Sequence, residues 1–354
     1  MSDTASLKPC LVLGTGFHHW VLGDATDYGS LVSWESLLRK TAFNMQIPWP
    51  STHGNRLALQ WETLTLFAAH NGYLNTRYNK WVSPPNAQQV FRIEAEMKRE
   101  AAVILKDLQK RYPWESSRAS FPKSGFWGAV VSLNFDMAWF SNEDVHWSKL
   151  HGSVCTRSVE TSPDRERLRL NNACNLTSET KDDLRVWFPN GCTAHHESLR
   201  LGLRDFGMQV SAIKNAFEQV KSFERAYRAT PKADWANYFE ALRPIMDGYP
   251  TLHSHFGNNP LPLSWVTEML YRPVLFAGVG LSQDELGLWW LMCQRARNLA
   301  HIPESQRPKT AILIRRDNPE LAFWQSKPFG IEPLVCASWD EGWSQCELWS
   351  NTYE

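Results

Sequence analysis

Short apolar runs, each followed by turn residues, recur along the chain and predict the strands of a sheet. The first run, at 10–13, ends in Gly14-Thr15-Gly16, which is typical of a buried strand that leads into a glycine turn. Runs of the same kind predict further strands at 128–133, 145–150, 184–188, 274–277, 310–314 and 331–335.

Helical periodicity fills much of the chain between these runs. It is clearest between Val90 and Leu108, where apolar residues recur at steps of three and four among Glu, Lys and Arg. Ser33 is a natural N-cap for a helix over 33–41. The pattern predicts further helical regions at 55–112, 204–245 with a break near Pro231, 263–270, 283–300 and 319–325.

Strands that alternate with helices at both ends of the chain predict an α/β fold with one Rossmann-like parallel sheet flanked by helices. The helical regions at about 55–112 and 204–245 are expected to be insertions into this arrangement. The polar and charged segment 156–183 is expected to be an exposed excursion between strands. Because no internal repeat or low-complexity linker divides the chain, we expect a single domain over 1–354.

Charge and cysteine usage narrow the classes of function. Basic and acidic residues both number 37, so the formal net charge is zero and no global field recruits nucleic acid. The seven cysteines form no CxxC pair, which argues against a zinc ribbon and against a secreted disulfide framework. The longest apolar runs, such as 273–280, are too short to span a bilayer. We therefore expect a cytoplasmic protein without a membrane or nucleic-acid partner.

Tryptophan is the outlier of the composition, with 18 residues spread from Trp20 to Trp349. Indole rings supply stacking surfaces for ligands or large fillers for a core, and their position inside apolar runs favours the core. Trp289 and Trp290 are expected on a buried helix face for the same reason.

Two glycine turns connect a predicted strand to the segment that follows it. In Gly14-Thr15-Gly16 the glycines would let the backbone approach a pyrophosphate. Gly278-Val279-Gly280 is followed by Ser282, a natural helix N-cap, and by the acidic residues Asp284 and Glu285. Each turn also has a plain geometric explanation, as a tight connection or a helix cap without a ligand.

Polar residues follow two other predicted strands. Asn134 and Asp136 lie in Ser-Leu-Asn-Phe-Asp at 132–136, and the carboxyl ends of parallel strands are where ligands bind. An Asx turn that bonds only the backbone explains this pair equally well. His151, in Lys-Leu-His-Gly-Ser at 149–153, suits proton transfer near neutral pH, although a lone histidine also serves structural roles.

The order of these four segments is more specific than any one of them. A GxG after the first strand, an Asn-x-Asp at a strand end, a Lys-Leu-His-Gly about fifteen residues later and a late Gly-x-Gly-x-Ser resemble the SIR2-like family. LNFD looks like the TxNxD segment of that family, KLHG like its KxHG segment, and GVGLSQDE like its late GxS loop. Together the segments span residues 14–285, which is most of the chain.

This resemblance implies attack at the ribose C1′ of NAD with departure of nicotinamide, and it requires no metal. Asn134 would hold the nicotinamide ribose and the nucleophile, Asp136 would orient the same pocket, and His151 would be the general base. Cleavage builds oxocarbenium character that polar groups around the ribose stabilise. The residues implied to contact NAD are Gly14, Thr15 and Gly16 along the pyrophosphate, Phe17, Gly152, Gly278 and Asp284, and Gly280 with Ser282 on the adenosine side.

The sequence departs from the deacylating members of that family. Those sirtuins carry a zinc module of four cysteines in two CxxC pairs, with the acyl-lysine groove beside it, and this chain has no such pair. It is similar instead to the bacterial SIR2-like branch whose members hydrolyse NAD, often in anti-phage defence. The resemblance therefore implies an NAD glycohydrolase that yields nicotinamide and ADP-ribose. The alternatives are a sensor that binds NAD or ADP-ribose without turnover, and an NAD-dependent deacylase.

Such an activity needs regulation, because a potent NAD hydrolase that is always active would be lethal. The sequence shows no separate sensor domain. We therefore expect control by homo-oligomerisation through the helical insertions, or by a partner such as an ATPase or other activator encoded nearby.

Three further features allow either a ligand or a structural role. The histidines at 18–19, 195–196 and 253–255 lack a cysteine or carboxylate pattern that would complete a site, so we expect no metal. The run 186–191 fits a lid over the ligand and an ordinary strand ending in a turn equally well. For Arg315-Arg316, solvation of a strand end is favoured over binding of a phosphate.

Overall fold

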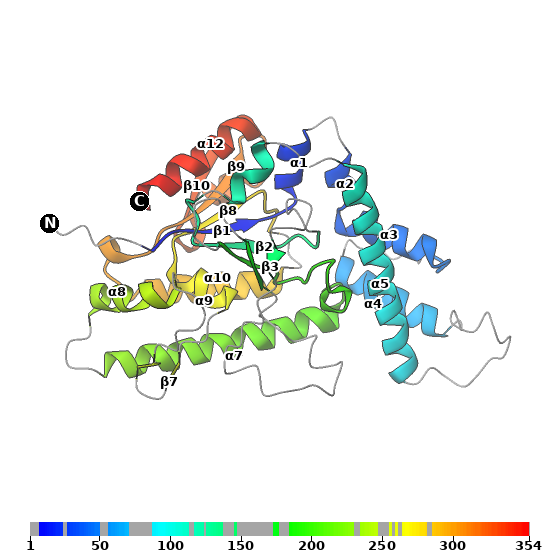
Figure 1. The fold of residues 1–354 in the computed structure, drawn as a ribbon, viewed down its shortest axis with the longest axis horizontal. Coiled ribbons are helices and arrows are strands. Elements are labelled where there is room, and N and C mark those ends of the chain that lie inside the picture. The colour runs from blue at the N-terminus through cyan, green and yellow to red at the C-terminus, as the bar shows by residue number, and fades with distance from the viewer. Residues whose placement is uncertain are drawn as a thin grey trace.

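The chain forms an α/β fold built on one sheet of eight strands, shown in Figure 1. The computed structural model describes residues 7–23, 27–49, 56–70, 87–112, 117–123, 125–136, 145–146, 173–176, 184–229, 234–246, 255–256, 259–260, 264–281 and 285–353. The order of strands in the sheet is β10-β9-β8-β1-β2-β5-β4-β3. Their bounds are β1 Cys10–Leu13, β2 Ala129–Ser132, β3 Val145–His146, β4 Ala173–Leu176, β5 Leu184–Trp187, β8 Val274–Ala277, β9 Thr310–Arg315 and β10 Ile331–Cys336. The short strands β6 (His255–Phe256) and β7 (Asn259–Pro260) pair separately.

Six neighbouring strands of the sheet, from β10 to β5, are parallel, which confirms the predicted Rossmann-like α/β fold. Counted along the chain within this set, their order is 3-2-1-4-5-6. Every residue of β1, β2, β5 and β8 is buried, as expected for strands that are covered on both faces. The apolar runs in the sequence therefore marked these strands correctly.

Beside these six parallel strands the sheet has an antiparallel edge, which the sequence did not reveal. β4 pairs antiparallel with β5, and β3 pairs antiparallel with β4. β4 lies within 156–183, the segment expected to be an exposed excursion, so that expectation is wrong at 173–176. Local sequence does not reveal strand direction, because direction depends on which neighbour the strand pairs with.

The chain changes the side on which it adds strands between β5 and β8. β2 and β5 lie on one side of β1, whereas β8, β9 and β10 lie on the other. In doubly wound sheets ligands bind outside the carboxyl ends of the strands at this switch point. The loops after β1 and β8, which are the two glycine turns, both begin there.

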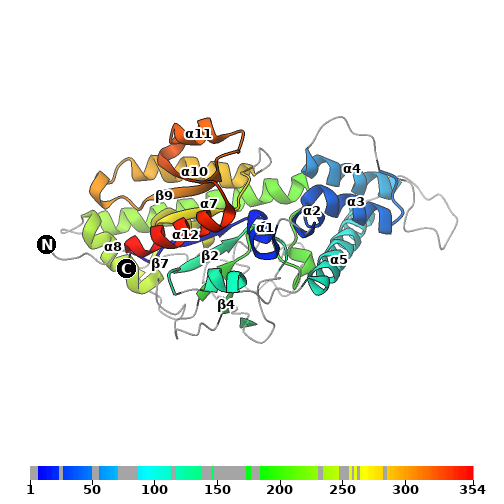
Figure 2. The same ribbon diagram turned by 90° about the horizontal axis from the view of Figure 1, so that it is seen from above.

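Helices cover both faces of the sheet and create an apolar core on each, as Figure 2 shows from above. Alternate strand residues enter opposite cores, with Cys10 and Val12 on one face and Leu11 and Leu13 on the other. The first core is completed by α7 (Leu203–Arg228), α8 (Trp235–Met246), α9 (Trp265–Tyr271), α10 (Leu286–Leu299) and α11 (Leu321–Gln325). The second is completed by α1 (Gly16–Leu22), the 3-10 helix η2 (Ser117–Lys123) and α12 (Trp339–Ser350).

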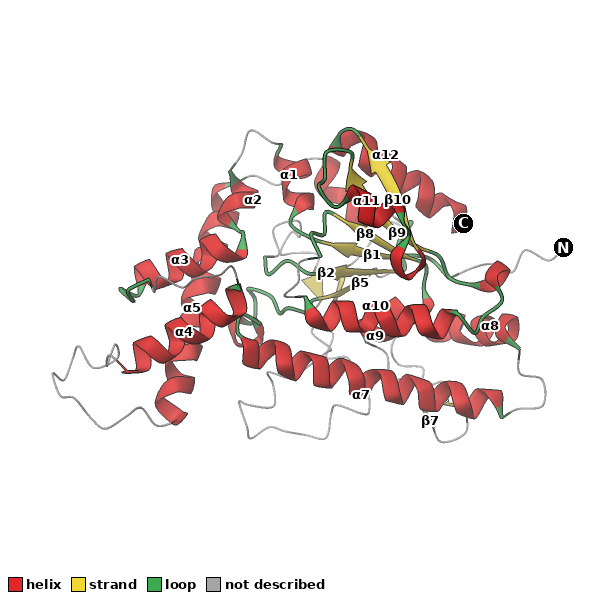
Figure 3. Cartoon of the chain, turned by 180° about the vertical axis from the view of Figure 1, so that it is seen from behind, coloured by secondary structure: helices red, strands yellow, loops and turns green. Residues whose placement is uncertain are grey.

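Four helices form a third core beside the sheet. They are α2 (Tyr28–Leu31), α3 (Trp34–Asn44), α4 (Leu57–His70) and α5 (Ala87–Arg111). The buried stripe of α5 contains the residues that the periodicity singled out, including Ile93, Met97 and Leu108. Figures 1 and 3 show these helices grouped beyond α1, at the end of the molecule opposite the two chain termini. The assignment of a single domain with two insertions stays a prediction.

Helix ends follow local capping chemistry. Ser33 caps α3, and its hydroxyl accepts a hydrogen bond from Ser36 N at 3.3 Å, as predicted. The helix expected from 283 begins at Leu286 with Glu285 in the N-cap position, so the proposed cap at Ser282 is wrong for α10. α1 was not predicted, because seven residues are too few to show helical periodicity.

Tryptophans fill the cores, as the sequence predicts. Trp61, Trp187 and Trp265 are fully buried. On α10, Trp289 stacks on Trp324 with 6.1 Å between ring centroids.

Within the described ranges, no helix has the length and apolar character needed to cross a membrane.

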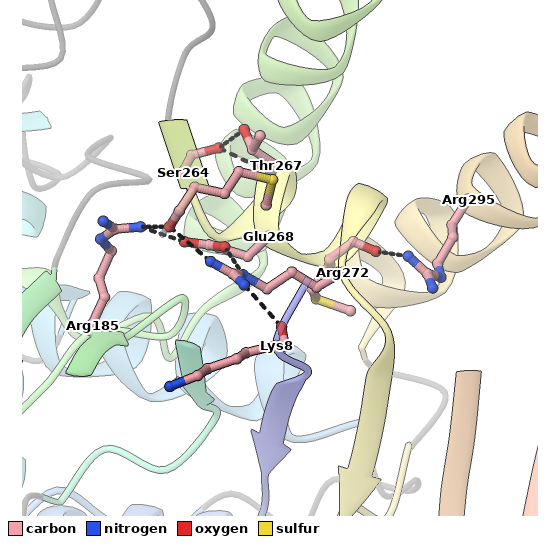
Figure 4. Close-up of polar contacts among 9 residues, drawn as sticks. Lys8, Arg185, Ser264, Thr267, Glu268, Arg272 and Arg295 are labelled. Carbon is pink, nitrogen blue, oxygen red and sulfur yellow. Dashed lines mark hydrogen bonds and ion pairs between the residues drawn. The ribbon is translucent and has the colours of Figure 1, made fainter. Parts of the chain in front are cut away.

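A buried ion-pair network closes the amino edge of the sheet (Figure 4). The Glu268 carboxylate on α9 lies 2.7 Å from Arg185 Nη1 and 2.6 Å from Arg272 Nε. Arg272 also donates to the carbonyls of Lys8 and Met246, at 2.8 and 2.7 Å. These contacts tie the entries to β1 and β8 to the ends of α8 and α9, and they hold the amino edge while the carboxyl edge carries the candidate site.

Candidate functional site

The loops after β1 and β8 are joined backbone to backbone at the carboxyl edge of the sheet. Gly14 N donates to Ala277 O at 3.1 Å, and Gly16 N donates to Gly278 O at 2.9 Å. The two glycine turns, more than 250 residues apart in the sequence, therefore meet at the switch point.

Three glycines are required by this contact. A Cβ atom on Gly14 would lie 2.3 Å from Gly278 O, and one on Gly16 would lie 2.6 Å from Gly278 Cα. Gly278 has a φ of +64°, and its own Cβ would lie 2.6 Å from Phe17 N. Gly280, by contrast, is exposed and has open space at its Cβ position. Loop packing thus explains three of the four glycines, and their contact with a pyrophosphate stays a prediction.

The residues around the start of α1 face different surroundings. Thr15 is exposed, whereas Phe17 is fully buried with its ring edge-on to Trp343 at 5.5 Å between centroids. The backbone N–H of Phe17 donates to Gly14 O at 3.1 Å. The Phe17 ring therefore belongs to the core between α1 and α12, and Thr15 is the side chain of this loop that reaches the surface.

Asn134 connects the end of β2 to the glycine loop after β1. Asn134 is 4% exposed, and its Nδ2 donates to Gly14 O at 3.1 Å. Because Leu13 of β1 pairs with Ser132 of β2, a side chain two residues beyond β2 reaches the loop beyond β1. This bond crosses between strands, whereas an Asx turn would bond only the local backbone. The structure therefore brings together two of the segments on which the family resemblance rests.

Asp136 lies against a histidine of α1. His18 Nε2 is 3.1 Å from Asp136 Oδ2, and the two side chains are 0% and 2% exposed. The ring of Tyr28 packs edge-on against the imidazole, with 5.3 Å between centroids. Sequence reasoning considered His18 only as a metal ligand and missed this contact. No local signal marks it, because the partners lie on either side of α2 to α5 in the chain.

Tyr28, which packs on His18, has a phenol in buried surroundings. Burial raises the pKa of the Tyr28 phenol well above its ordinary value, and the Asp136 carboxylate raises it further. The phenol is therefore protonated over the whole physiological range. Beside it, Tyr112 packs at 5.0 Å between centroids and donates to Asp27 Oδ1 at 2.6 Å. The rings of Tyr112, Tyr28 and His18 thus pack in series, and His18 contacts the buried carboxylate.

The segment after β5 is a buried turn, which decides between the two interpretations left open for 186–191. Asn190 Nδ2 donates to Leu133 O at 3.1 Å, and Asn190 Oδ1 accepts from Gln209 Nε2 at 3.3 Å. Gly191 has a φ of +85°, as a tight turn requires. The segment is therefore a strand end followed by a buried turn that contacts the end of β2.

Four predicted site residues fall outside the described ranges. They are His151, Gly152, Ser282 and Asp284. The roles assigned to them, the general base above all, stay predictions.

The remaining candidate features of the sequence are a metal site at the histidines and a phosphate site at Arg315-Arg316. In the part of the chain that the structure describes, no three His, Cys, Asp or Glu side chains gather where they could hold a metal ion. Arg315 Nη2 lies 2.6 Å from Asp317 Oδ2 at the end of β9, which agrees with solvation of a strand end.

Comparison of the chain with protein-family models finds no match, and comparison with curated proteins finds no significant match either. The structure supports the α/β fold that the SIR2-like resemblance implies, with six parallel strands. The resemblance to the SIR2-like family itself stays a prediction from the four sequence segments.

Proposed function

We propose that this protein is an NAD glycohydrolase, which cleaves the bond between nicotinamide and ribose and gives nicotinamide and ADP-ribose. The observation that supports this best is the hydrogen bond from Asn134 Nδ2 to Gly14 O, at 3.1 Å. This bond connects two segments. The resemblance assigns one of them, which contains Asn134, to the ribose, and the other, which contains Gly14, to the pyrophosphate. The junction lies at the switch point of a doubly wound sheet, which is where such sheets bind dinucleotides.

In the proposed reaction NAD lies over the joined loops, with its pyrophosphate along 14–16 and its nicotinamide ribose beside Asn134. The nicotinamide ring of NAD carries the positive charge and departs as neutral nicotinamide with the electron pair of the C1′–N bond, so positive charge develops on the ribose before water attacks C1′. The Asp136 carboxylate is almost fully buried, and a fixed negative charge in such surroundings stabilises a developing cation more strongly than water does. His151 acts as the general base on water or on a ribose hydroxyl.

We further propose that this activity is a regulated effector of anti-phage defence that depletes NAD after assembly. The helices α3 to α5 offer exposed apolar side chains suited to self-association, and an activating partner such as an ATPase is the alternative trigger. These side chains are Phe43, Leu59, Leu66, Phe67 and Val103.

Nicotinamide release from NAD by the purified chain, alone and with the products of neighbouring genes, tests the proposal. We expect release by the wild type. Asn134→Ala should lower the rate by about a hundredfold or more, because it removes a polar group beside the charge that develops. His151→Ala should abolish release.

Asn190→Ala is a matched control for Asn134→Ala. Both asparagines are 4% exposed, and both donate from Nδ2 to a backbone carbonyl at 3.1 Å. Each alanine variant should lose about 1–3 kcal/mol of stability, but Asn134→Ala should lose far more turnover than Asn190→Ala. Absence of release under every condition, with NAD binding intact, would favour the sensor. Release that requires an acylated peptide would favour the deacylase.

A further inference from the structure

Asp136 occupies a position that is unfavourable for an unassisted carboxylate. It is 1% exposed at the end of β2, where an ionised group without compensation loses its hydration. The structure places the fully buried imidazole of His18 against it, with Nε2 at 3.1 Å from Oδ2. A histidine in this position places a polar ring nitrogen beside the carboxylate.

The surroundings of His18 fix its ring. His18 lies in the first turn of α1, two residues after Gly16, so the glycine loop determines where α1 begins. The Tyr28 ring packs against the imidazole at an interplanar angle of 84°. Tyr112 in turn packs edge-on against Tyr28, with 69° between the rings. The imidazole is therefore held by both the carboxylate and the aromatic side chains.

Two contacts join the segment 14–18 to the segment 134–136. One is the bond from Asn134 to Gly14, and the other is the contact of His18 with Asp136. Both contacts connect the segment that follows β1 to the segment that follows the neighbouring strand β2. Loss of either contact would let the two sides of the candidate ribose pocket move relative to each other.

We propose that His18 is a positioning residue, which sets the orientation of the Asp136 carboxylate toward the nicotinamide ribose. This rests on the proposed function in one respect, namely that NAD is the ligand. His18 acts through Asp136 and does not itself touch NAD. A small displacement of a positioned group is enough to lower binding or turnover by a large factor.

The contact between the two residues is tested without NAD, by nuclear magnetic resonance of protein labelled with ¹⁵N in histidine. His18→Phe identifies the His18 signals. Asp136→Asn keeps the shape of the side chain and removes its charge, so the His18 imidazole nitrogens should shift while those of His19 stay in place. Unchanged His18 signals in Asp136→Asn would overturn the proposal.

The positioning role is tested by NAD affinity, measured by titration calorimetry. His18→Phe should weaken NAD binding by about tenfold or more, as loss of an orienting partner does elsewhere. His18→Gln should restore most of the affinity, because its amide donates from near the position of Nε2. His19→Phe is the matched control on the next, half-buried residue of α1, and it should bind NAD as the wild type does.

A double-mutant cycle separates positioning from a general structural effect. In the Asp136→Asn background His18→Phe should change NAD affinity little, because the group that it positions is already altered. Equal losses in both backgrounds would overturn the positioning role. If His18→Phe does not fold, His18→Asn, whose shorter amide does not reach the position of Nε2, completes the same cycle with Asp136→Asn. A wild type that binds no NAD would contradict the proposed function, whereas the histidine signals would still decide whether the contact exists.

Discussion

Gly278 is the residue at which the two loops of the candidate site come closest. An alanine there would need a positive φ and would place its Cβ 2.6 Å from Phe17 N. We therefore expect Gly278→Ala to lower the free energy of unfolding by about 2–4 kcal/mol. Urea unfolding followed by tryptophan fluorescence measures this change.

Gly280→Ala is the control for that experiment. Gly280 lies two residues further along the same loop, without a positive φ and with open space at its Cβ position. Its substitution should change the free energy of unfolding by less than about 0.5 kcal/mol. Similar losses in the two variants would show that the loop contact at Gly278 does not determine the stability of this edge.

Cys192, in the buried turn after β5, gives a prediction about pH. Burial raises the pKa of its thiol from 9.0 to about 11. Between these values the folded chain keeps a proton that the unfolded chain releases. The contribution to stability is therefore complete below pH 9 and is lost as the pH rises toward 11, at up to about 1.4 kcal/mol per pH unit.

Cys192→Ala should therefore show a shallower fall of stability across this pH range than the wild type. Denaturant unfolding at several pH values between these limits measures the two slopes, and groups that titrate in both proteins cancel in the comparison. Parallel slopes would mean that the thiol is not protected from titration in the folded state.

At the scale of elements, the amino edge of the sheet depends on Glu268. Its carboxylate compensates two buried guanidinium groups, those of Arg185 and Arg272. Glu268→Gln keeps the size of the side chain but leaves both cations without a counter-charge. We expect a loss of about 3–5 kcal/mol in the free energy of unfolding, since breaking a buried ion pair is strongly destabilising.

The control for this network is Glu35→Gln, which removes the partner of Arg39 on the surface of α3. That pair is more than half exposed on both sides, so its loss should change stability by about 0.5 kcal/mol or less. Chemical unfolding of the two variants side by side provides the test. An equal effect of the two substitutions would contradict the role of the buried network.

Elements were predictable where local sequence decides them. The strand at 10–13 and the helix α5 show in the sequence because burial on both faces, or on one stripe, leaves a continuous or periodic apolar pattern. β4 was missed because a four-residue strand within a polar segment leaves no such pattern. Its antiparallel pairing depends on the neighbouring β5, which local sequence does not identify.

The candidate site was predictable only as separate segments. Glycines after a strand and Asn134 with Asp136 after another mark two strand ends. That these ends are neighbours follows from the sheet order, in which β1 pairs with β2. The contact of His18 with Asp136 needed the structure, because its meaning lies in the burial and distance of two side chains far apart in the chain.

At the scale of the whole molecule, the sheet order explains why the candidate site lies where it does. Strands are added first on one side of β1 and then on the other, so the loops after β1 and β8 meet at the carboxyl edge. The ion-pair network around Glu268 lies at the opposite, amino edge. The molecule thus separates an edge held by buried charges from an edge at which glycine loops and polar side chains converge.

The central claim, that an NAD-derived dinucleotide binds over the joined loops, is tested most directly by a crystal structure with ADP-ribose, the product of the proposed reaction. We predict that its pyrophosphate lies along Gly14 to Gly16 and that its terminal ribose lies next to Asn134 and Asp136. ADP-ribose bound elsewhere on the chain, with these residues unchanged and free of ligand, would contradict the claim.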